Sequence, residues 1–237
     1  MRVCHRTHQG LVRASNQDSV LMDTGVYGVA DGMGGHKGGE TASRVAVQVI
    51  RNALRGKKPE QRALEVGIEA ANRRIFDMSR HDSALNGMGT TLTFLWENGE
   101  EVFISHVGDS RVYLLRKDEW KQVTQDHSVV AELMRSGVIT AEAARTHPYR
   151  NVITRAVGVD PTVEADLFTH DLQPGDLWLI CSDGLYNMVP DDVLKQVLEN
   201  AESDETAADE LLQLALEGGG TDNITFVLCR VPEVDAV

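Results

Sequence analysis

Cysteines and long apolar runs are scarce in this 237-residue chain. The three cysteines, Cys4, Cys181 and Cys229, lie far apart and show no CxxC spacing. Their small, odd number argues against a disulfide framework and a zinc knuckle and indicates a reducing compartment. No apolar run approaches the length of a membrane span, and the opening MRVCHRTHQG lacks the apolar core of a secretory signal. We therefore expect a cytoplasmic protein with no membrane partner.

Basic residues are also few compared with acidic ones. Lys and Arg total 23, Asp and Glu total 36, and the formal net charge is −13. Such a surface repels a phosphate backbone, so we expect no nucleic-acid partner. Solubility accounts for most of the excess, and the remainder is expected in aspartates that bound cations would neutralise.

Several familiar catalytic motifs are missing as well. The chain has no complete GxGxxG, Walker, GxSxG, HExxH or EF-hand pattern, and no cysteine stands in a C-x₅-R loop. These absences argue against nucleotide-binding loops, serine hydrolases and thiol phosphatases. No internal repeat or long linker interrupts the chain, and its length suits one domain over residues 1–237.

The periodicity of apolar residues predicts an α+β protein. Period-two segments predict strands at SVLMD, VYGVA, TTLTFLW, EVFISHV, RVYLLR, VEADLFTHDL, LWLICS and NITFVLCRV, with RKDEW among the turns. Helical spacing and capping signals predict helices over 41–54, 59–76, 126–137, 206–216 and directly after Pro190. This order differs from βαβ alternation and favours two packed antiparallel sheets with helices outside.

Aspartates stand at the ends of the strongest predicted strands. Asp31 closes YGVAD, Asp109 closes ISHVGD, Asp183 closes LWLICSD, and Asp222 precedes the last strand, while Asp18 lies in RASNQD. Each apolar strand is expected to be rigid, so its end would present a carboxylate from a fixed position. A single Asp-Gly pair is more often an ordinary turn, but a turn does not explain the repetition.

Converging carboxylates cannot all stay ionised without a counter-charge. A shared proton or a bound metal would supply it. Five acids without cysteine, and without a histidine pair at ligand spacing, favour hard cations that prefer oxygen, namely Mn²⁺ or Mg²⁺. The sequence therefore predicts a metal site.

Eight short motifs, in order, resemble one family. RASNQD, VADGMGGHKGGE, GMGTTL, HVGDSRVYLL, TQDHS, HPYRNVITRAVG, LICSDGL and GGTDNITFVL are similar to the motifs of the bacterial type 2C (PPM) metal-dependent protein phosphatases, over nearly the whole chain. The resemblance implies a four-layer αββα sandwich, in which two central antiparallel sheets are flanked by pairs of helices. It also implies hydrolysis of phosphoserine and phosphothreonine in proteins.

The resemblance implies metal roles residue by residue. Asp31 would bridge two core ions, the Gly32 carbonyl would bind one of them, and Asp183 and Asp222 would bind the other. Asp18 would act nearby through metal-bound water. In the glycine-rich loop GVADGMGGHKGGE, side chains would then obstruct the approach of Asp31 and Gly32 to the ions.

Further roles follow from the same resemblance. Asp109 would help Asp183 to hold a third, weaker ion, and Arg13 would hold the substrate phosphate. Residues 125–158 would form a flap beside the site that is linked to substrate choice. His36 would either protonate the leaving alkoxide or order its loop, because Met33 occupies the position of the histidine found in members from higher organisms. Tyr186 is expected to shape the floor of the groove.

The predicted chemistry is hydrolysis by water. Two divalent ions lower the pKa of bound water toward neutrality, and the hydroxide attacks phosphorus in line. The expected partners are phosphorylated proteins and a cognate Ser/Thr kinase, and the protein is expected to be a monomer. Two alternatives remain: a non-catalytic pseudophosphatase that binds phosphoproteins, and a two-metal nuclease, against which the negative charge counts.

Overall fold

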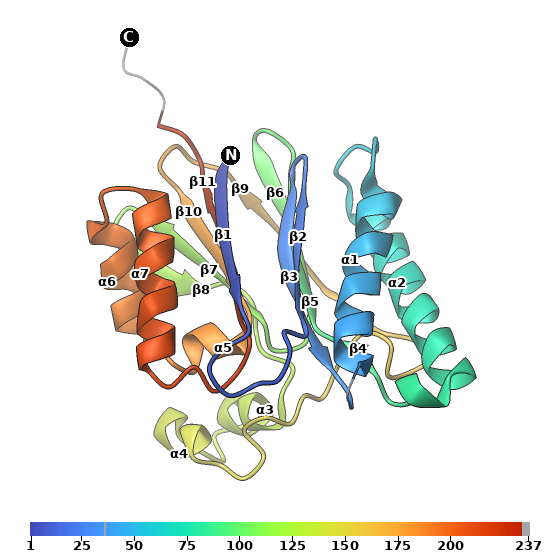
Figure 1. The fold of residues 1–237 in the computed structure, drawn as a ribbon. Helices are drawn as coiled ribbons and strands as arrows, with labels where there is room; N and C mark the ends of the chain where they lie inside the picture. Colours follow the sequence, from blue (N-terminus) through green and yellow to red (C-terminus); the bar gives the residue numbers. More distant parts are fainter. Residues whose placement is uncertain (36, 234–237) are drawn as a thin grey trace.

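A computed structural model of the chain describes residues 1–35 and 37–233, in which two antiparallel β-sheets lie face to face (Figure 1). The five-stranded sheet has the order β1 (Arg2–His8), β11 (Ile224–Arg230), β10 (Leu177–Cys181), β7 (Arg111–Arg116) and β8 (Glu119–Gln122). The six-stranded sheet has the order β2 (Asp18–Asp23), β3 (Val26–Met33), β5 (Leu92–Glu97), β6 (Glu101–Val107) and β9 (Asp166–Asp171), and β4 (Gly89–Thr90) pairs with β3.

Pairs of helices cover the outer faces of both sheets. Helices α1 (Gly38–Leu54) and α2 (Gln61–His81) cover the six-stranded sheet, and α6 (Asp191–Asn200) and α7 (Asp204–Glu217) cover the five-stranded one (Figure 1). This arrangement confirms the predicted four-layer αββα sandwich. The short helices are η1 (Ser83–Leu85), α3 (Val129–Arg135), α4 (Ala141–Arg145) and α5 (Asp183–Tyr186). Among the described residues, none of the helices combines the length and the apolar character that crossing a bilayer would require.

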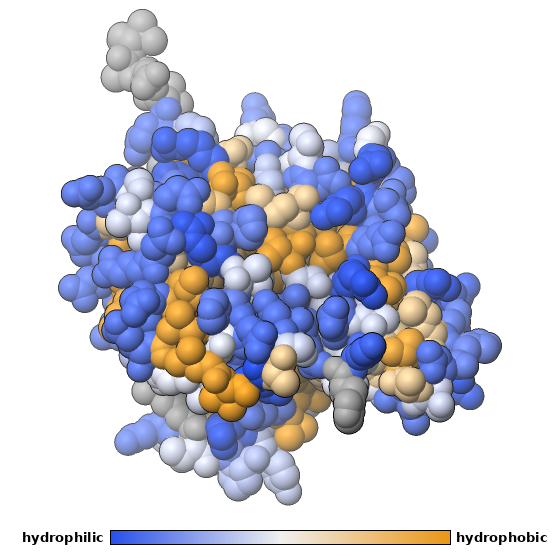
Figure 2. All heavy atoms as spheres, in the orientation of Figure 1, coloured by the Kyte–Doolittle hydropathy of each residue, from blue (hydrophilic) through white to orange (hydrophobic). Residues whose placement is uncertain are grey.

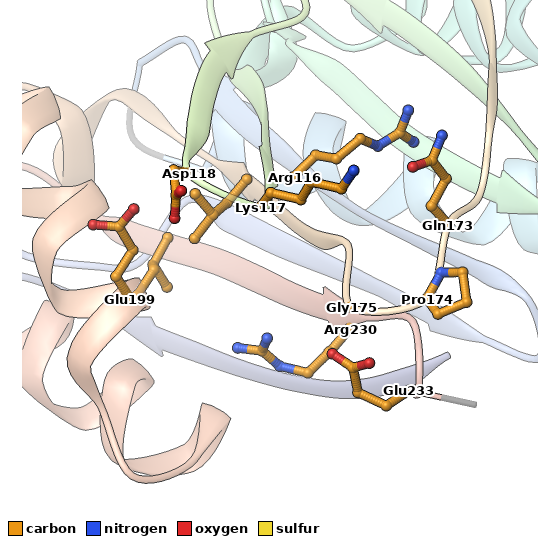
Figure 3. Close-up of a pocket in the computed structure, with 11 residues that line it drawn as sticks. Arg116, Lys117, Asp118, Gln173, Pro174, Gly175, Glu199, Arg230 and Glu233 are labelled. Atoms are coloured by element: carbon orange, nitrogen blue, oxygen red, sulfur yellow. The ribbon is translucent and has the colours of Figure 1, made fainter. Parts of the chain in front are cut away.

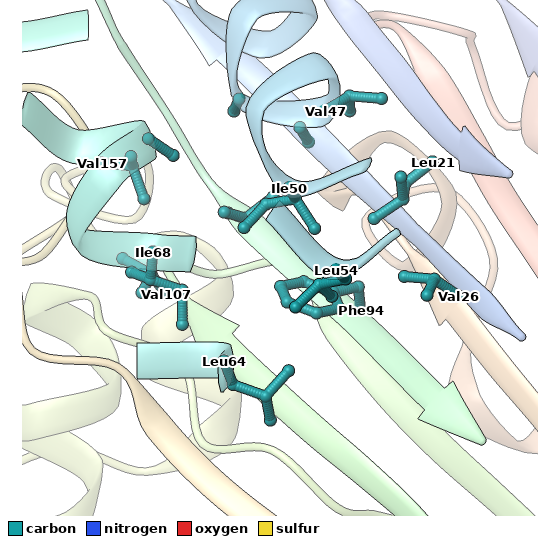
Figure 4. Close-up of a cluster of buried hydrophobic side chains, with 14 of the residues drawn as sticks. Leu21, Val26, Val47, Ile50, Leu54, Leu64, Ile68, Phe94, Val107 and Val157 are labelled. Atoms are coloured by element: carbon teal, nitrogen blue, oxygen red, sulfur yellow. The ribbon is translucent and has the colours of Figure 1, made fainter. Parts of the chain in front are cut away.

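Three apolar layers hold the sandwich together. Between α1, α2 and the six-stranded sheet lie Ile50, Leu64, Ile68, Phe94 and Val107 (Figure 4). Between the two sheets lie Val29, Ile104, Trp178, Ile180 and Val227. Between α6, α7 and the five-stranded sheet lie Leu194, Ala208, Leu211, Phe226 and Leu228. Fully burying one such large side chain contributes about 1.5–3 kcal/mol, so these layers supply a rigid scaffold for the strand ends.

Capping chemistry explains where the helices begin. Helix α7 begins after Ser203, whose Oγ accepts a hydrogen bond from the Thr206 N–H at 3.1 Å. The prediction that a helix begins at Asp126 was wrong by three residues. Ser128 is the N-cap of α3, because its Oγ accepts a hydrogen bond from the Ala131 N–H, while the Asp126 carboxylate binds Arg111.

One predicted turn is partly a strand. The turn expected over RKDEW is confined to Lys117 and Asp118, and β8 begins at Glu119. The Trp120 ring stacks on Tyr113 of β7 with ring centroids 4.7 Å apart. This cross-strand aromatic contact favours strand pairing at a position where the local sequence favours a turn.

Candidate metal centre and phosphate site

Strand topology brings the five predicted acids to one end of the sandwich. Asp18 opens β2 and lies directly opposite Asp31 of β3 in the strand register. Asp109 follows β6 by two residues, Asp183 follows β10 by two, and Asp222 precedes β11 by two. Because neighbouring strands are antiparallel, these positions fall on the same edge of the two sheets. We call this edge, with these five aspartates, the acid-rich end.

A hydrogen bond joins the two sheets at the acid-rich end. Ser182, which follows β10, donates from Oγ to Asp18 Oδ2 at 2.8 Å. Both side chains are buried, and Asp18 belongs to the other sheet. The contact therefore sets how closely the carboxylates of the two sheets approach.

The backbone of Asp31 is held by threonines. The Asp31 N–H donates to Thr91 Oγ1 at 2.8 Å, and Thr90 Oγ1 donates to the Asp31 carbonyl at 2.9 Å. The Thr91 hydroxyl also lies 2.8 Å from Ser110 Oγ, next to Asp109. With its backbone groups satisfied, Asp31 presents its carboxylate from a fixed position.

The acids at this end perturb one another. Burial raises the pKa of Asp18 to about 6, and burial together with the Asp126 carboxylate raises the pKa of Asp109 to about 7. Burial and the neighbouring carboxylates raise the pKa values of Asp31 and Asp183 well above the usual range of aspartate. The neighbours that act on Asp31 include all four other acids. The cluster therefore needs positive charge or protons to be stable near neutral pH.

The donor set fits hard divalent cations. Asp18 Oδ1 and Asp183 Oδ1 are buried and have no hydrogen-bond partner within the described residues. Over residues 1–35 and 37–233, no three Asp, Glu, His or Cys side chains form a ready-made cage around one point. Mg²⁺ usually keeps several waters and takes only one or two carboxylates, so orphaned carboxylate oxygens without a closed cage suit such an ion.

Arg13 reaches the acid-rich end from the loop between β1 and β2. Its Nη2 donates to Asp222 Oδ2 at 2.7 Å, and the arginine side chain stays 53% exposed. Arg13 therefore forms an ion pair, but its partner is not an ordinary surface acid, because Asp222 is itself a predicted metal ligand. The guanidinium has five N–H donors, so it can bind Asp222 and still present donors to an anion in solvent.

The structure corrects one detail of the glycine-rich segment and adds another. Asp31 is not the end of its strand, because Gly32 and Met33 continue β3 by pairing with Thr90 and Gly89 of β4. Packing gives a further reason for the glycine at position 32, beside its predicted approach to metal ions. A Cβ there would lie 2.1 Å from the Gly39 carbonyl oxygen, so tight packing of the loop backbone against α1 excludes any side chain. His36 lies outside the described residues.

Sequence reasoning did not find a network that supports Asp109. Arg111 binds both carboxylate oxygens of Asp126, with Nη2 2.7 Å from Oδ2 and Nε 3.0 Å from Oδ1. Its guanidinium carbon lies 3.6 Å from the centre of the Tyr186 ring. The Tyr186 hydroxyl in turn donates to the Asp109 carbonyl at 3.0 Å. Arg111 belongs to the motif HVGDSRVYLL and Asp126 to TQDHS, but no feature of the sequence predicts that the two side chains bind each other.

Asn223 is a second residue that sequence reasoning did not single out. Its Nδ2 donates to the carbonyls of Gln9 and Ser15, and its Oδ1 accepts from the Gln17 N–H. These bonds hold both ends of the loop that carries Arg13. The feature of the sequence that could have indicated its role is its position directly after Asp222.

The opposite end of the five-stranded sheet has a pocket of about 500 Å³ (Figure 3). Its lining includes Arg116, Lys117, Glu199, Arg230 and Glu233. Arg116 is paired with Asp176 at 2.7 Å and Arg230 with Asp204 at 2.6 Å. With these arginines neutralised inside the protein, the pocket shows no convergent chemistry and is not the functional site.

Comparisons with known proteins agree with the geometry. The family model of Protein phosphatase 2C matches residues 8–217. The serine/threonine phosphatase Stp of Listeria innocua is 39% identical over an alignment that covers 94% of this chain and 93% of that protein.

Solved structures show the same fold. The crystal structure of the Mycobacterium tuberculosis serine/threonine phosphatase PstP superposes with a TM-score of 0.91 at 39% identity, covering 98% of this chain and 99% of that one. The catalytic domain of PstP in complex with two manganese ions has a TM-score of 0.89 at 37% identity and covers 98% of each chain. The resemblance seen in the sequence is therefore confirmed, and the chain belongs to the protein phosphatase 2C family of metal-dependent serine/threonine phosphatases.

Proposed function

We propose that this protein hydrolyses phosphoserine and phosphothreonine in phosphorylated proteins, using two core Mn²⁺ or Mg²⁺ ions and a third, weaker one. The observation that carries the proposal is the convergence of Asp18, Asp31, Asp109, Asp183 and Asp222 on one edge of a rigid scaffold, where burial and neighbouring carboxylates raise the pKa values of the first four. Buried carboxylates without counter-charges are costly to stability, and they cluster at sites that bind cations. The manganese ions of the PstP structure support this choice of ligand.

The acids divide into groups according to their proposed roles. Asp31, the Gly32 carbonyl, Asp183 and Asp222 would hold the core ions, and Asp18 would act through water. Asp109 would join Asp183 in holding the third ion. Bound divalent ions supply charge neutralisation and a water of lowered pKa.

Arg13 would bind the phosphate of the substrate. It lies on the rim of the acid-rich end, half exposed and bound to Asp222. A guanidinium can form two parallel hydrogen bonds with phosphate oxygens and can stabilise the charge that they carry. The Asp222 contact would keep the side chain oriented toward the site before the substrate arrives.

The wider setting is also part of the proposal. We treat residues 1–237 as one catalytic domain that acts as a cytoplasmic monomer and opposes a Ser/Thr kinase. Residues 125–158 would form a flap. They carry α3 and α4, which lie at the same end of the sandwich as the loop between β1 and β2 (Figure 1).

Activity and binding assays together test the function. Wild-type protein should hydrolyse p-nitrophenyl phosphate and a phosphothreonine peptide with Mn²⁺ or Mg²⁺, and EDTA should stop both reactions. Full activity in EDTA would refute metal dependence. Peptide binding without turnover in either metal would instead identify a pseudophosphatase.

A further inference from the structure

Two large aliphatic side chains lie exposed immediately before Arg13. Leu11 is 65% exposed and Val12 is 69% exposed. They are the only consecutive pair among the exposed large hydrophobic side chains of the described residues. Isolated exposed aliphatics need no explanation, but a pair beside a proposed phosphate-binding residue does.

The loop that carries this pair is held firmly. The Leu11 N–H donates to the Gly220 carbonyl at 2.7 Å, and Gln9 Nε2 donates to the Arg13 carbonyl at 2.6 Å. Gly10 has a φ of +80°, and a Cβ there would lie 2.1 Å from the Asp222 carbonyl oxygen. The two side chains are therefore presented to solvent from a fixed backbone.

The exposed pair continues into an apolar face of α7. Leu212 and Leu216 are partly buried and stand four residues apart, so they share one face of the helix. A Cβ at Gly220 would lie 3.0 Å from Leu11 Cγ and 3.3 Å from Leu216 Cδ2, which places Gly220 between the two leucines. Figure 2 shows apolar atoms over the lower part of α7 and over the adjoining loop. We call Leu11, Val12, Leu212 and Leu216 the apolar strip.

Charged residues mark both ends of the apolar strip. Beyond Leu212, Arg6 of β1 pairs with Asp209 at 2.7 Å and with Glu205 at 2.8 Å. Asp209 lies three residues before Leu212 and therefore on the same side of α7. At the other end, Val12 adjoins Arg13, which is paired with Asp222. The strip thus leads from a closed ion-pair cluster to the proposed phosphate site.

We infer that the apolar strip binds the segment of the phosphoprotein substrate that adjoins the phosphorylated residue, and that it selects substrates with large aliphatic or aromatic side chains there. The inference rests on the proposed function of Arg13. An extended substrate advances about 3.3 Å per residue, so a phosphate held at Arg13 places its neighbouring side chains within reach of Val12 and Leu11. Burying apolar surface on both partners then adds affinity that a small phosphate ester cannot gain.

Kinetics on matched substrates test the inference. The substrates are a phosphothreonine peptide with leucines flanking the phosphothreonine, the same peptide with glycines, and p-nitrophenyl phosphate. Wild type should prefer the leucine peptide, and the double variant Leu11→Ser/Val12→Ser should raise KM for it by about 5- to 20-fold. Its constants for the glycine peptide and for p-nitrophenyl phosphate should stay within about twofold of wild type. Val66→Ser on α2, which is also exposed, is the control and should change none of them.

A binding measurement separates this inference from the proposed function. In methyl-labelled protein, the leucine peptide should shift the Leu11 and Val12 signals and the glycine peptide should not, whether or not turnover occurs. If no substrate is turned over but the leucine peptide still shifts the Leu11 and Val12 signals, the proposed function is wrong and the docking surface stands. If the double variant loses activity equally on all three substrates, or if the leucine peptide shifts the Leu11 and Val12 signals no more than the glycine peptide does, the docking surface is wrong. A wild-type dimer that the double variant converts to monomer would assign the strip to self-association instead.

Discussion

Asp176 and Asp18 are both buried aspartates, but they lie at opposite ends of the β-sandwich and have different partners. Asp176 is 1% exposed and accepts hydrogen bonds from Arg116 Nε at 2.8 Å, from Arg116 Nη2 at 2.7 Å and from the Gln173 N–H at 2.8 Å. Asp18 is 9% exposed, and its Oδ2 accepts a hydrogen bond from Ser182 Oγ at 2.8 Å. Its Oδ1 has no hydrogen-bond partner in the described part of the chain. One carboxylate is neutralised within the protein, whereas the other lies among further carboxylates.

This difference separates structural charge from functional charge. A buried ion pair with satisfied hydrogen bonds keeps its charge at little net cost. The acid-rich end carries repulsion that added cations or protons would relieve, and natural proteins retain such a cost where a site needs it. The comparison predicts that substitutions at the acid-rich end change catalysis, while substitutions around Asp176 change stability.

Asp222→Asn should have the largest effect. In the proposed site, removing this carboxylate charge would weaken the hold on a core ion, so we expect kcat/KM to fall by at least about 1,000-fold, equivalent to roughly 4 kcal/mol. The melting temperature of the chelated protein should change little, because the variant removes a repulsive charge from the acid-rich end together with the half-exposed Asp222–Arg13 ion pair. Kinetics, Mn²⁺ calorimetry and thermal melts on the same preparation measure these effects. Unchanged Mn²⁺ affinity and turnover would remove Asp222 from the site.

Asp176→Asn should produce the opposite pattern. It leaves Arg116 without its buried partner, and since Arg116 is about a quarter exposed, the expected loss is about 2–3 kcal/mol of unfolding free energy. Activity per folded molecule should stay at the wild-type value. Denaturant unfolding combined with active-site titration checks both. Lost catalysis in a fully folded variant would break the proposed division between the two ends.

Arg13→Ala tests the rim of the acid-rich end. Charge-assisted hydrogen bonds of about 1.5–3 kcal/mol predict a loss of roughly 10- to 150-fold in kcat/KM on a phosphopeptide. Arg13→Lys should recover only part of the loss, because lysine keeps the positive charge but cannot form two parallel hydrogen bonds with the phosphate oxygens. Mn²⁺ titration should match wild type in both variants. A variant with wild-type kinetics would return Arg13 to the role of a surface ion pair.

Arg111→Lys should have the smallest of the four effects. Lysine cannot both bind Asp126 bidentately and stack on Tyr186, so the segment carrying Asp109 should loosen. We expect about a tenfold lower kcat with a raised Mn²⁺ requirement, while the two tight ions stay bound. Calorimetry across a range of Mn²⁺ concentrations, beside the kinetics, distinguishes the sites. Equal weakening of all bound ions would mean that Arg111 supports the whole end of the sandwich.

Much of the fold could be predicted from local pattern. The strands EVFISHV and RVYLLR occur with the predicted bounds. A helix forms around residues 41–54, where apolar spacing predicted it, and another after Pro190, where the capping signals predicted it. Apolar period and capping are properties of adjacent residues, so the sequence carries them directly. The turn at RKDEW was mistaken because the stacking partner of Trp120, Tyr113, comes from the neighbouring strand.

By itself, the sequence determined the layer order, the five acids next to strand ends and the family, because these depend on residue type and order. Only the tertiary structure decided which groups meet. Ser182 binds Asp18 across 164 residues, Arg13 binds Asp222 across 209, and Gly220 lies between Leu216 and Leu11. The tertiary structure alone also decides the Arg111–Asp126–Tyr186 network and the apolar strip. The physical reason is that strand register and sheet packing fix these contacts, and both result from the packing of the entire core.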